Sequence, residues 1–445
     1  MRIQQHFLLF SLCLIFHLNA FSQGLPPTDN VLVSGPMVGY CEMREVMLWV
    51  QTNGTAIVQI EYSAGEGSPT YRTPAYQTRQ DQAFTAHLIA DQVLPGTTYS
   101  YKLFINGKEV QRPYDMVFQT PPLWQWRTDP PEFSIAMGSG TYINDEAYDR
   151  PGRPYGADYR IFESIHKQSP DIMLWLGDNN YLREADWNSA TGIVHRNTHT
   201  RQIEEMQALL ASTANYAIWD DHDYGPNDSD YTYWGKTMTS KAFQLFWGNP
   251  SYGLPGLGGT TSVFEWGDAH FFLLDNRYFR DPNDRKTSAR SILGEEQLQW
   301  LLDALVSSKA TFKFVVIGGQ VINDVAKYEN YANVAPAERS RILNTIVDEG
   351  IKNVIFLTGD RHHSEISLFE KNGIKIYDVT SSPLTSGPNS AQDEPNTLRV
   401  KGSFVGERNF AVLYLSGKRT ERKVGVKFFD SDGKELWAYD FEAQK

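Results

Sequence analysis

The sequence predicts an α/β core with a mixed sheet, preceded by an all-β sandwich. After residue 131, short apolar segments alternate with helical patterns, as where HFFLLD precedes GEEQLQWLLDALVSS and FKFVVIGG precedes PAERSRILNTIVDEG. Between residues 28 and 121, by contrast, apolar and polar residues alternate with a period of two. The first pattern is typical of an α/β domain and the second of an antiparallel sandwich. A chain of 445 residues is long enough for both.

The first segment, residues 28–121, is predicted to be a fibronectin-like β-sandwich. It contains short runs rich in β-branched and aromatic residues, namely VMLWVQT, AIVQIEYS, AFTAHLIA and TYSYKLFING. The stretch LPGTTYSYKLFING is typical of that sandwich, and its Asn106-Gly107 pair predicts a hairpin turn. The stretch PPLWQWRTDPP would link it to the core. Because its sequence contains no catalytic grouping of side chains, we expect a scaffold or interaction module.

The second segment, residues 131–445, is predicted to contain buried strands between layers of helices, because its strands are apolar throughout. Pro336 stands near the start of one predicted helix and Gly350 just after its end, as is usual for helix boundaries. The runs NFAVLYLS, KVGVKFFD and LWAYDF would complete a sheet. In another predicted helix, leucines at i, i+3, i+4 and i+7 form one apolar face: Leu298, Leu301, Leu302 and Leu305.

Residues 1–22 have the pattern of a secretory signal peptide. Arg2 supplies the positive charge, the apolar stretch over residues 7–16 is too short to span a bilayer, and Ala20-x-Ser22 is a small-residue cleavage pattern. We therefore predict an exported protein, periplasmic or extracellular after cleavage, with no transmembrane segment.

The composition excludes several classes of function. Lys and Arg number 41 against 53 Asp and Glu, which gives a net charge of −12 without any block of like charge. This balance argues against a nucleic-acid partner and against a basic membrane-binding face, and it favours small substrates over polyanions. Cys13 would leave with the signal peptide, so Cys41 has no partner for an internal disulfide, and we expect it to be a packed, inert thiol.

Ionisable side chains follow several predicted strands at the point where each strand ends. DIMLWL ends in GDNNY, ANYAIW ends in DDHD, VIFLT ends in GDRHH, and HFFLL is followed by an Asp and an Arg. Because open α/β sheets bind ligands at the carboxyl ends of their strands, we expect these groups to converge. A single Asp after a strand is more often a turn or a helix cap, but several such ends in one domain favour a metal site.

Carboxylates combined with imidazoles suit Mn, Fe, Zn, Mg or Ca. An Asp shared by two cations would hold them ~3.5–4 Å apart, so that they clamp a phosphate and supply a hydroxide nucleophile near neutral pH. A His beside them would protonate the departing alkoxide. These groups would therefore suit metal-assisted attack on a phosphate.

In their order along the chain, these motifs resemble the metallophosphoesterase superfamily, and within it the PhoD-like (alkaline phosphatase D) family. That family joins an N-terminal fibronectin-like domain to a four-layer αββα core, so the resemblance covers nearly the whole mature chain. GDNNY resembles the family's G-D-x-x-Y. This implies that Asp178 bridges two metal ions and that Tyr181 is a phenolate ligand of the first, ferric-type ion.

The other two motifs extend the resemblance. WDDHD resembles the family's W-D-D-H-E, which implies that Asp221 binds the second ion and that His222 contacts substrate or protonates the leaving group. GDRHH resembles G-D-x-H, which implies that Asp360 and His362 bind the second and the first ion respectively. Asn227, in YGPND, would add an amide oxygen to the second ion. The resemblance implies two or more metal ions, with Ca, Fe or Mn expected, and a small phosphorylated substrate.

One position departs from the family pattern. The family carries Ser-Cys after the first core strand, and the Cys thiolate binds the first ion. Here residues 138–141 read GSGT, with Gly140 in the place of the thiolate. We expect that water or a neighbouring side chain such as Asn144 or Asp145 completes the shell, or that the first ion binds weakly. Iron is therefore doubtful as the native metal.

Other candidates each have two interpretations. Arg277 would either place a guanidinium on the substrate phosphate or form an ion pair that holds a loop. His363 would either contact substrate or pack behind His362. His195 and His199 share a helix face, but no carboxylate is evident near them in sequence, which favours a solvated face. The segment TSSPLTSG, residues 380–387, would be either a pocket rim or a plain loop.

The sequence therefore predicts an exported metal-dependent phosphatase or phosphodiesterase in which a metal-bound hydroxide attacks phosphorus. Two alternatives stay open. One is a catalytically degenerate protein that binds a phosphorylated or other anionic ligand, as the glycine at position 140 suggests. The other is an enzyme that acts on sulfate esters or another anion with the same cluster.

Overall fold

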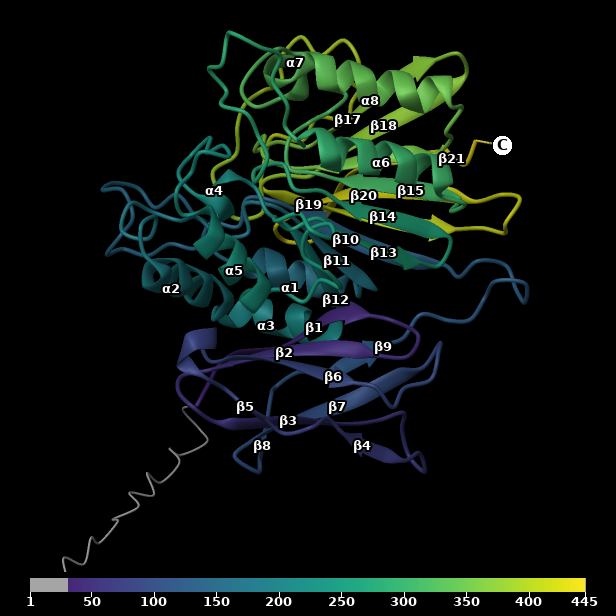
Figure 1. Ribbon diagram of the computed structural model, residues 1–445. Helices are drawn as coiled ribbons and strands as arrows, with labels where there is room; N and C mark the ends of the chain where they lie inside the picture. The colour runs from purple at the N-terminus through teal and green to yellow at the C-terminus, as the bar shows by residue number, and fades with distance from the viewer. Residues whose placement is uncertain (1–30, 445) are drawn as a thin grey trace, which may run out of the picture.

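The computed structural model describes residues 31–444, so the predicted signal peptide lies outside the described residues. From bottom to top, Figure 1 shows the N-terminal sandwich, a layer of helices, two facing sheets, and a second layer of helices. The predicted α/β core and the all-β region before it are confirmed.

No helix within residues 31–444 is both long enough and apolar enough to cross a membrane.

The N-terminal region consists of two small antiparallel sheets. One has the strand order β1-β2-β6 and the other β4-β3-β7-β8, with β5 and β9 pairing with β3 and β7. Asn106 and Gly107 have φ of +51° and +78°, so the predicted hairpin turn joins β7 to β8. The strands are β1 (Leu32–Cys41), β2 (Val46–Thr52), β3 (Ile57–Ser63), β4 (Thr70–Arg72), β5 (Tyr76–Gln77), β6 (Thr85–Ala90), β7 (Thr98–Ile105), β8 (Lys108–Val110) and β9 (Val117–Gln119), with a 3₁₀ helix at Gln80–Gln82.

The core contains two mixed sheets that face each other. The first has the order β12-β11-β10-β19-β20-β21, in which β10, β11 and β12 are parallel and β19 runs antiparallel to β10. Its strands are β10 (Phe133–Gly138), β11 (Ile172–Leu176), β12 (Ala214–Ile218), β19 (Asn409–Ser416), β20 (Lys423–Asp430) and β21 (Glu435–Glu442). The second has the order β13-β14-β15-β16-β18-β17. Its strands are β13 (Ser262–Trp266), β14 (Ala269–Leu273), β15 (Phe312–Val316), β16 (Val354–Thr358), β17 (Glu365–Lys371) and β18 (Ile374–Thr380).

Helices cover the outer face of each core sheet, which explains why β11, β12, β15 and β16 are buried at every position. The expectation of uniformly apolar strands is wrong for β20, which alternates, and for the edge strand β21, which is largely exposed. The predicted leucine face is buried in α6, and Pro336 is the first residue of α8. Gly350, with φ of +65°, follows the end of α8. The helices are α1 (Arg160–Lys167), α2 (Ala190–Arg201), α3 (Glu204–Ser212), α4 (Asp221–Tyr224), α5 (Lys236–Phe246), α6 (Glu295–Ser307), α7 (Tyr331–Val334) and α8 (Pro336–Asp348).

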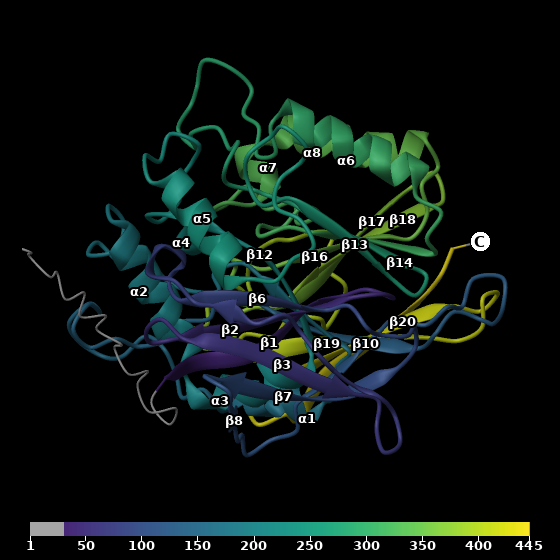
Figure 2. The same ribbon diagram turned by 60° about the horizontal axis from the view of Figure 1, so that its bottom comes forward.

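The sandwich lies beside the core in both views (Figure 1 and Figure 2), and its strand β1 contacts α3 and β12 of the core. One apolar cluster runs from the interior of the sandwich into the space between the core sheets. Because the two regions share this cluster, it does not separate them into domains, and the boundaries at residues 121 and 131 stay a prediction. Polar contacts cross the junction too: Ser34 donates a hydrogen bond to the carbonyl of Arg201 at 2.7 Å. Cys41 lies buried at this junction as a free thiol, and burial raises its pKa, as expected for an inert cysteine.

Candidate metal centre

Six of the predicted site residues line one open pocket of about 640 Å³, namely Asp178, Asp221, His222, Asn227, Asp360 and His362. Asp178 follows β11, Asp221 begins α4 just after β12, and Asp360 and His362 follow β16. Since β11 and β12 belong to one core sheet and β16 to the other, the carboxyl ends of both sheets contribute to the site. The remaining lining residues are Tyr155, Asp228, Tyr328, Glu329, Arg361, Gly387, Pro388 and Asn389.

Three of these side chains stand on left-handed backbone. The φ angles are +50° at Asp178, +66° at Asp360 and +54° at His362. Residues other than glycine occupy this region at a cost of about 1–3 kcal/mol each, and they concentrate at functional sites. The turns after β11 and β16 therefore hold these side chains at the pocket at an energetic cost.

The imidazole of His362 is oriented like that of a metal-binding histidine. Its Nδ1 lies 2.7 Å from the carbonyl oxygen of Gly387. Because a carbonyl can only accept, Nδ1 carries the proton and Nε2 keeps its lone pair. Nε2 lies 3.3 Å from the hydroxyl of Tyr181, which in turn lies 3.3 Å from Asp178 Oδ2. Burial lowers the pKa of His362 to about 4, so the ring is neutral at neutral pH.

The carboxylates of the pocket repel one another. Burial raises the pKa of Asp178 well above its ordinary value, and the nearby carboxylate of Asp221 raises it further. Burial acts in the same way on the pKa of Asp360. Asp178, Asp221 and His222 offer donor atoms that all lie within 4.8 Å of one another. Cations would remove this repulsion, and the carboxylate, phenol and imidazole donors fit hard or borderline ions.

A second acidic group, made of Asp220, Asp221 and Glu329, is occupied by a guanidinium. Arg277 forms ion pairs with both Asp220 and Glu329, and its side chain is only 1% exposed. Of the two interpretations of Arg277, the structure favours the ion pair that holds a loop. The proposed contact with a substrate phosphate is corrected, because the guanidinium is buried and already engaged by carboxylates.

His363 does not line the pocket either. It is fully buried, its Nδ1 lies 3.1 Å from the carbonyl oxygen of Arg361, and its ring centroid lies 5.3 Å from that of Phe404. The structure therefore places His363 as a packing residue behind His362. The alternative of a direct substrate contact is corrected, because the ring is fully buried and does not line the pocket.

The side chains expected to replace the family thiolate are engaged elsewhere. Asn144 exchanges hydrogen bonds of 3.0 Å with the backbone of Gly156. Asp145 lies 3.2 Å from His195 Nε2 and 3.5 Å from Arg196. Neither side chain lines the pocket. The contact with Asp145 also gives His195 the carboxylate partner that its sequence neighbourhood did not reveal.

The structure adds residues that the motifs did not point to. Tyr155, which is distant in sequence from every motif, places its hydroxyl 3.0 Å from His362 Nδ1. The segment TSSPLTSG contributes Ser386, which is 3.4 Å from His362 Nε2, and Gly387, whose carbonyl orients the ring. For Ser386 and Gly387, the sequence offers one signal, the interpretation of residues 380–387 as a pocket rim. For Tyr155 it offers none.

A second pocket of about 320 Å³ adjoins the first. The two share Tyr155, His222 and Asn227, so they form one continuous concave surface. The second pocket is lined by three guanidinium groups: Arg150, Arg153 and Arg183. It therefore combines a positive charge with direct access to the acidic pocket.

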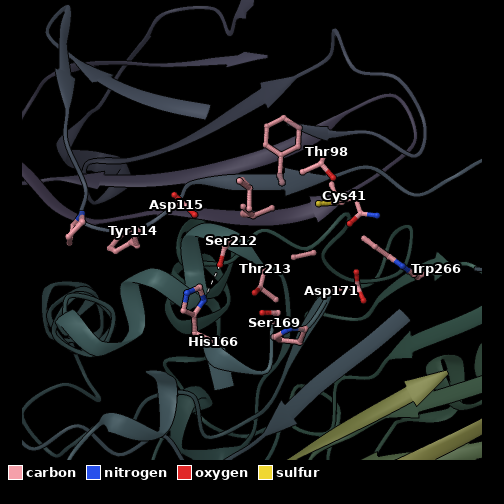
Figure 3. A pocket seen from close by; sticks show the side chains of 17 residues that line it. Cys41, Thr98, Tyr114, Asp115, His166, Ser169, Asp171, Ser212, Thr213 and Trp266 are labelled. Carbon is pink, nitrogen blue, oxygen red and sulfur yellow. Dashed lines mark hydrogen bonds between the residues drawn. The ribbon is translucent and has the colours of Figure 1, made fainter. Parts of the chain in front are cut away.

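Figure 3 shows a different cavity, of about 570 Å³, between the sandwich and the core. Its ionisable side chains include Asp115, His166 and Asp171, and His166 Nδ1 lies 3.2 Å from the hydroxyl of Ser212. Among the described residues, the groups able to hold a metal lie in the strand-end region and not here.

Two facing mixed sheets with a carboxylate and imidazole pocket at their strand ends define a protein with the metallophosphoesterase fold. Residues 151–420 match the PhoD-like phosphatase family, and the chain belongs to that family. Residues 29–123 match a domain of unknown function (DUF7800). The predicted family resemblance is thus confirmed.

Individual relatives agree with this assignment. The chain is 25% identical over 378 residues to alkaline phosphatase D of Bacillus subtilis (strain 168), covering 72% of this chain and 61% of that protein. It therefore spans somewhat less than two thirds of this relative. A solved structure of PhoD superposes with a TM-score of 0.77 at 18% identity, covering 94% of this chain and 92% of the other. A purple acid phosphatase from yellow lupin (Lupinus luteus) seeds has a TM-score of 0.68 at 13% identity, covering 92% of this chain and 74% of the other. Both structures share the fold.

Proposed function

We propose that this protein is an exported, metal-dependent hydrolase of phosphoric esters, acting as an alkaline phosphatase or phosphodiesterase. The observation that carries the proposal is the convergence of Asp178, Asp221, Asp360 and His362 on one pocket, from three strand ends in two sheets. Membership of the PhoD-like phosphatase family supports the same activity. Export rests on the sequence pattern of residues 1–22.

Each donor has a proposed place at the centre. Bound cations would withdraw charge from the phosphoryl oxygens and lower the pKa of a water molecule. Asp178 would bridge two ions because it lies between the other donors, within reach of Tyr181 on one side and Asp221 on the other. The proposed ligands of the first ion are Tyr181 and His362, and those of the second are Asp221, Asp360 and Asn227. The oxygen-rich set supports Ca or Mn as the native metals, whereas Gly140 in the place of the thiolate argues against Fe.

His222 is proposed to contact the leaving-group oxygen. Its ring lies against that of Tyr181, with centroids 4.3 Å apart, and it lines both the acidic pocket and the arginine-lined pocket. A substrate whose phosphate lies among the carboxylates would therefore direct its ester oxygen past His222. The imidazole would stabilise or protonate that oxygen as the bond to phosphorus breaks.

The neighbouring pocket is proposed to hold the rest of a small phosphorylated substrate. Arg183 lies over the rings of Tyr142 and Tyr181, at 4.6 and 5.5 Å from the centroids, which holds its guanidinium in the wall of the second pocket. A guanidinium next to an acidic centre attracts the anionic substrate. This attraction opposes the repulsion that the net charge of −12 exerts on an anion.

A catalytically degenerate ligand-binding protein is the second candidate, and Gly140 is the observation that favours it. A centre that lacks the family thiolate could hold an anion without turning it over. The two candidates differ in turnover, so one experiment separates them.

The test is turnover of an aryl phosphate monoester and of the matching diester by the purified chain. Ca, Mn, Fe, Mg and Zn are supplied one at a time at pH 7 to 9, and Asp178→Asn is the blank. Metal-dependent turnover that the blank lacks would establish the hydrolase, and the ratio of the two rates would define the ester class. A folded protein that is inactive with every metal would establish the binding protein instead. An aryl sulfate in the same panel tests the third class.

A further inference from the structure

The absence of a side chain at Gly140 leaves space that another residue fills. Gly140 has φ of +77°, and an ideal Cβ built on it would lie 2.8 Å from Ser386 Oγ and 3.2 Å from a side-chain carbon of Pro383. A side chain at position 140 and the hydroxyl of Ser386 therefore compete for the same volume. The carbonyl of Gly140 also accepts a hydrogen bond of 3.0 Å from the backbone N–H of Ser386, which holds the serine in this place.

The hydroxyl of Ser386 lies among the proposed ligands of the first ion. Ser386 is fully buried, and its Oγ is 3.4 Å from His362 Nε2. It also forms a side-chain hydrogen bond with Tyr181. The hydroxyl thus approaches the centre from the side on which the thiolate of the family would lie.

The spacing of the donor atoms suits a single cation. Asp178 Oδ2, the Tyr181 hydroxyl, His362 Nε2 and Ser386 Oγ form a chain with successive separations of 3.3, 3.3 and 3.4 Å. Two ligands that each lie ~2.0–2.2 Å from one ion are about 2.8–3.6 Å apart in octahedral or tetrahedral geometry. No other buried hydroxyl forms a hydrogen bond to Nε2 of this histidine within residues 31–444, apart from that of Tyr181.

We propose that Ser386 supplies the oxygen ligand that replaces the family thiolate at the first ion. The site then has only oxygen and nitrogen donors, which shifts its preference from thiophilic metals toward Mn²⁺ and other hard cations. This assignment rests on the proposed function, because it assumes the metal centre. It also explains how a chain with glycine at position 140 keeps a complete first site.

The test is metal binding by the full chain after its ions have been removed with a chelator. Mn²⁺ affinity is measured by calorimetry, and ions per chain are counted by mass spectrometry, for the unaltered chain, Ser386→Ala and Ser381→Ala. Ser381 is the matched control, since it is a buried serine of the same segment whose hydroxyl donates to the carbonyl of Met137 at 3.0 Å, away from the centre. We expect Ser386→Ala to weaken one of the binding events about ten-fold or more, because even an outer-shell change costs about that much.

A third variant, Ser386→Cys, tests direct contact and does not depend on how the alanine variant folds. A thiolate at position 386 that binds Co²⁺ gives a sulfur-to-cobalt charge-transfer band, and Cd²⁺ should then displace Mn²⁺. Absence of that band, or unchanged Mn²⁺ affinity in Ser386→Ala, would overturn the assignment. If Asp178→Asn loses Mn²⁺ binding but Ser386→Ala does not, the proposed function stands and the assignment of Ser386 is wrong. No Mn²⁺ binding by the unaltered chain would remove the metal requirement and this assignment with it.

Discussion

Ser386 Oγ lies 2.8 Å from the point that a Cβ atom on Gly140 would occupy, and 3.4 Å from Nε2 of His362. The positions 140 and 386 are far apart in sequence, but in the folded chain only one of them can place a side chain next to this histidine. A change at either position therefore has consequences that depend on the other.

The first prediction concerns this coupling. Gly140→Cys should lower the free energy of unfolding by about 1–3 kcal/mol, because the left-handed backbone disfavours a Cβ and the new atom meets Ser386 Oγ. Adding Ser386→Ala should recover part of that loss, since it removes the contacting oxygen. Urea denaturation of both single variants and the double variant gives the coupling free energy. Strictly additive effects would mean that the two residues do not compete for space.

The second prediction concerns Arg277. Arg277→Gln should lower the free energy of unfolding by about 3–5 kcal/mol, because it leaves the buried carboxylate of Asp220 without its cation and Glu329 with Arg280 as its remaining ion-pair partner. Arg277→Lys should cost less, since it keeps the charge but loses the two-pronged contact. Arg72→Gln is the control: it breaks the exposed pair with Glu61 and should change stability by less than about 1 kcal/mol. Equal effects at the two arginines would contradict the buried network.

The third prediction is a pH dependence set by Asp378. Burial raises the pKa of this carboxyl from 3.8 to about 6, although it accepts hydrogen bonds from the backbone of Val321 and Ile322 and from Thr358. Between about pH 4 and pH 6 the folded state then holds more protons than the unfolded state, so stability falls as the pH rises. The part of this decline that Asp378 contributes is on the order of 3 kcal/mol.

Asp378→Asn should flatten this decline, because the amide does not titrate. The measurement is the free energy of unfolding in urea at intervals from pH 4 to pH 6.5. Asp303→Asn, at an exposed position of α6, is the control and should keep the slope of the unaltered chain. An unaltered slope in Asp378→Asn would assign the pH dependence to other groups.

The fourth prediction concerns metal removal. The buried carboxylates repel one another in the chelated protein, and a bound cation would relieve this repulsion in the folded state. Because the ion binds the folded state and not the unfolded state, Mn²⁺ at 100 times its dissociation constant should stabilise the protein by about 2.7 kcal/mol per site. Thermal unfolding with and without the ion measures the gain. Asp178→Asn should show little gain, while Asp378→Asn, which removes an equally buried carboxyl elsewhere, should keep it. The same gain in both variants would place the ion outside the proposed centre.

The sequence by itself determined the secondary structure of the core and most of the candidate ligands. Strands such as β11 and β16 are recognisable because they are short, apolar throughout and buried on both faces. The residues after them, including Asp178 and Asp360, are placed by the chain itself, because a side chain just beyond a strand of an open sheet must lie at its carboxyl edge.

Only the tertiary structure decided which ionisable side chains line the pocket. It also decided which residue lies in the place of the missing thiolate. Arg277 follows a strand as Asp178 does, but it is drawn into an ion pair with Glu329, which lies 52 residues away. Ser386 is 246 residues from Gly140, and its role depends on a contact between their loops that no local pattern encodes. Local sequence specifies where a strand ends, whereas the partners of a side chain there depend on how distant segments pack around it.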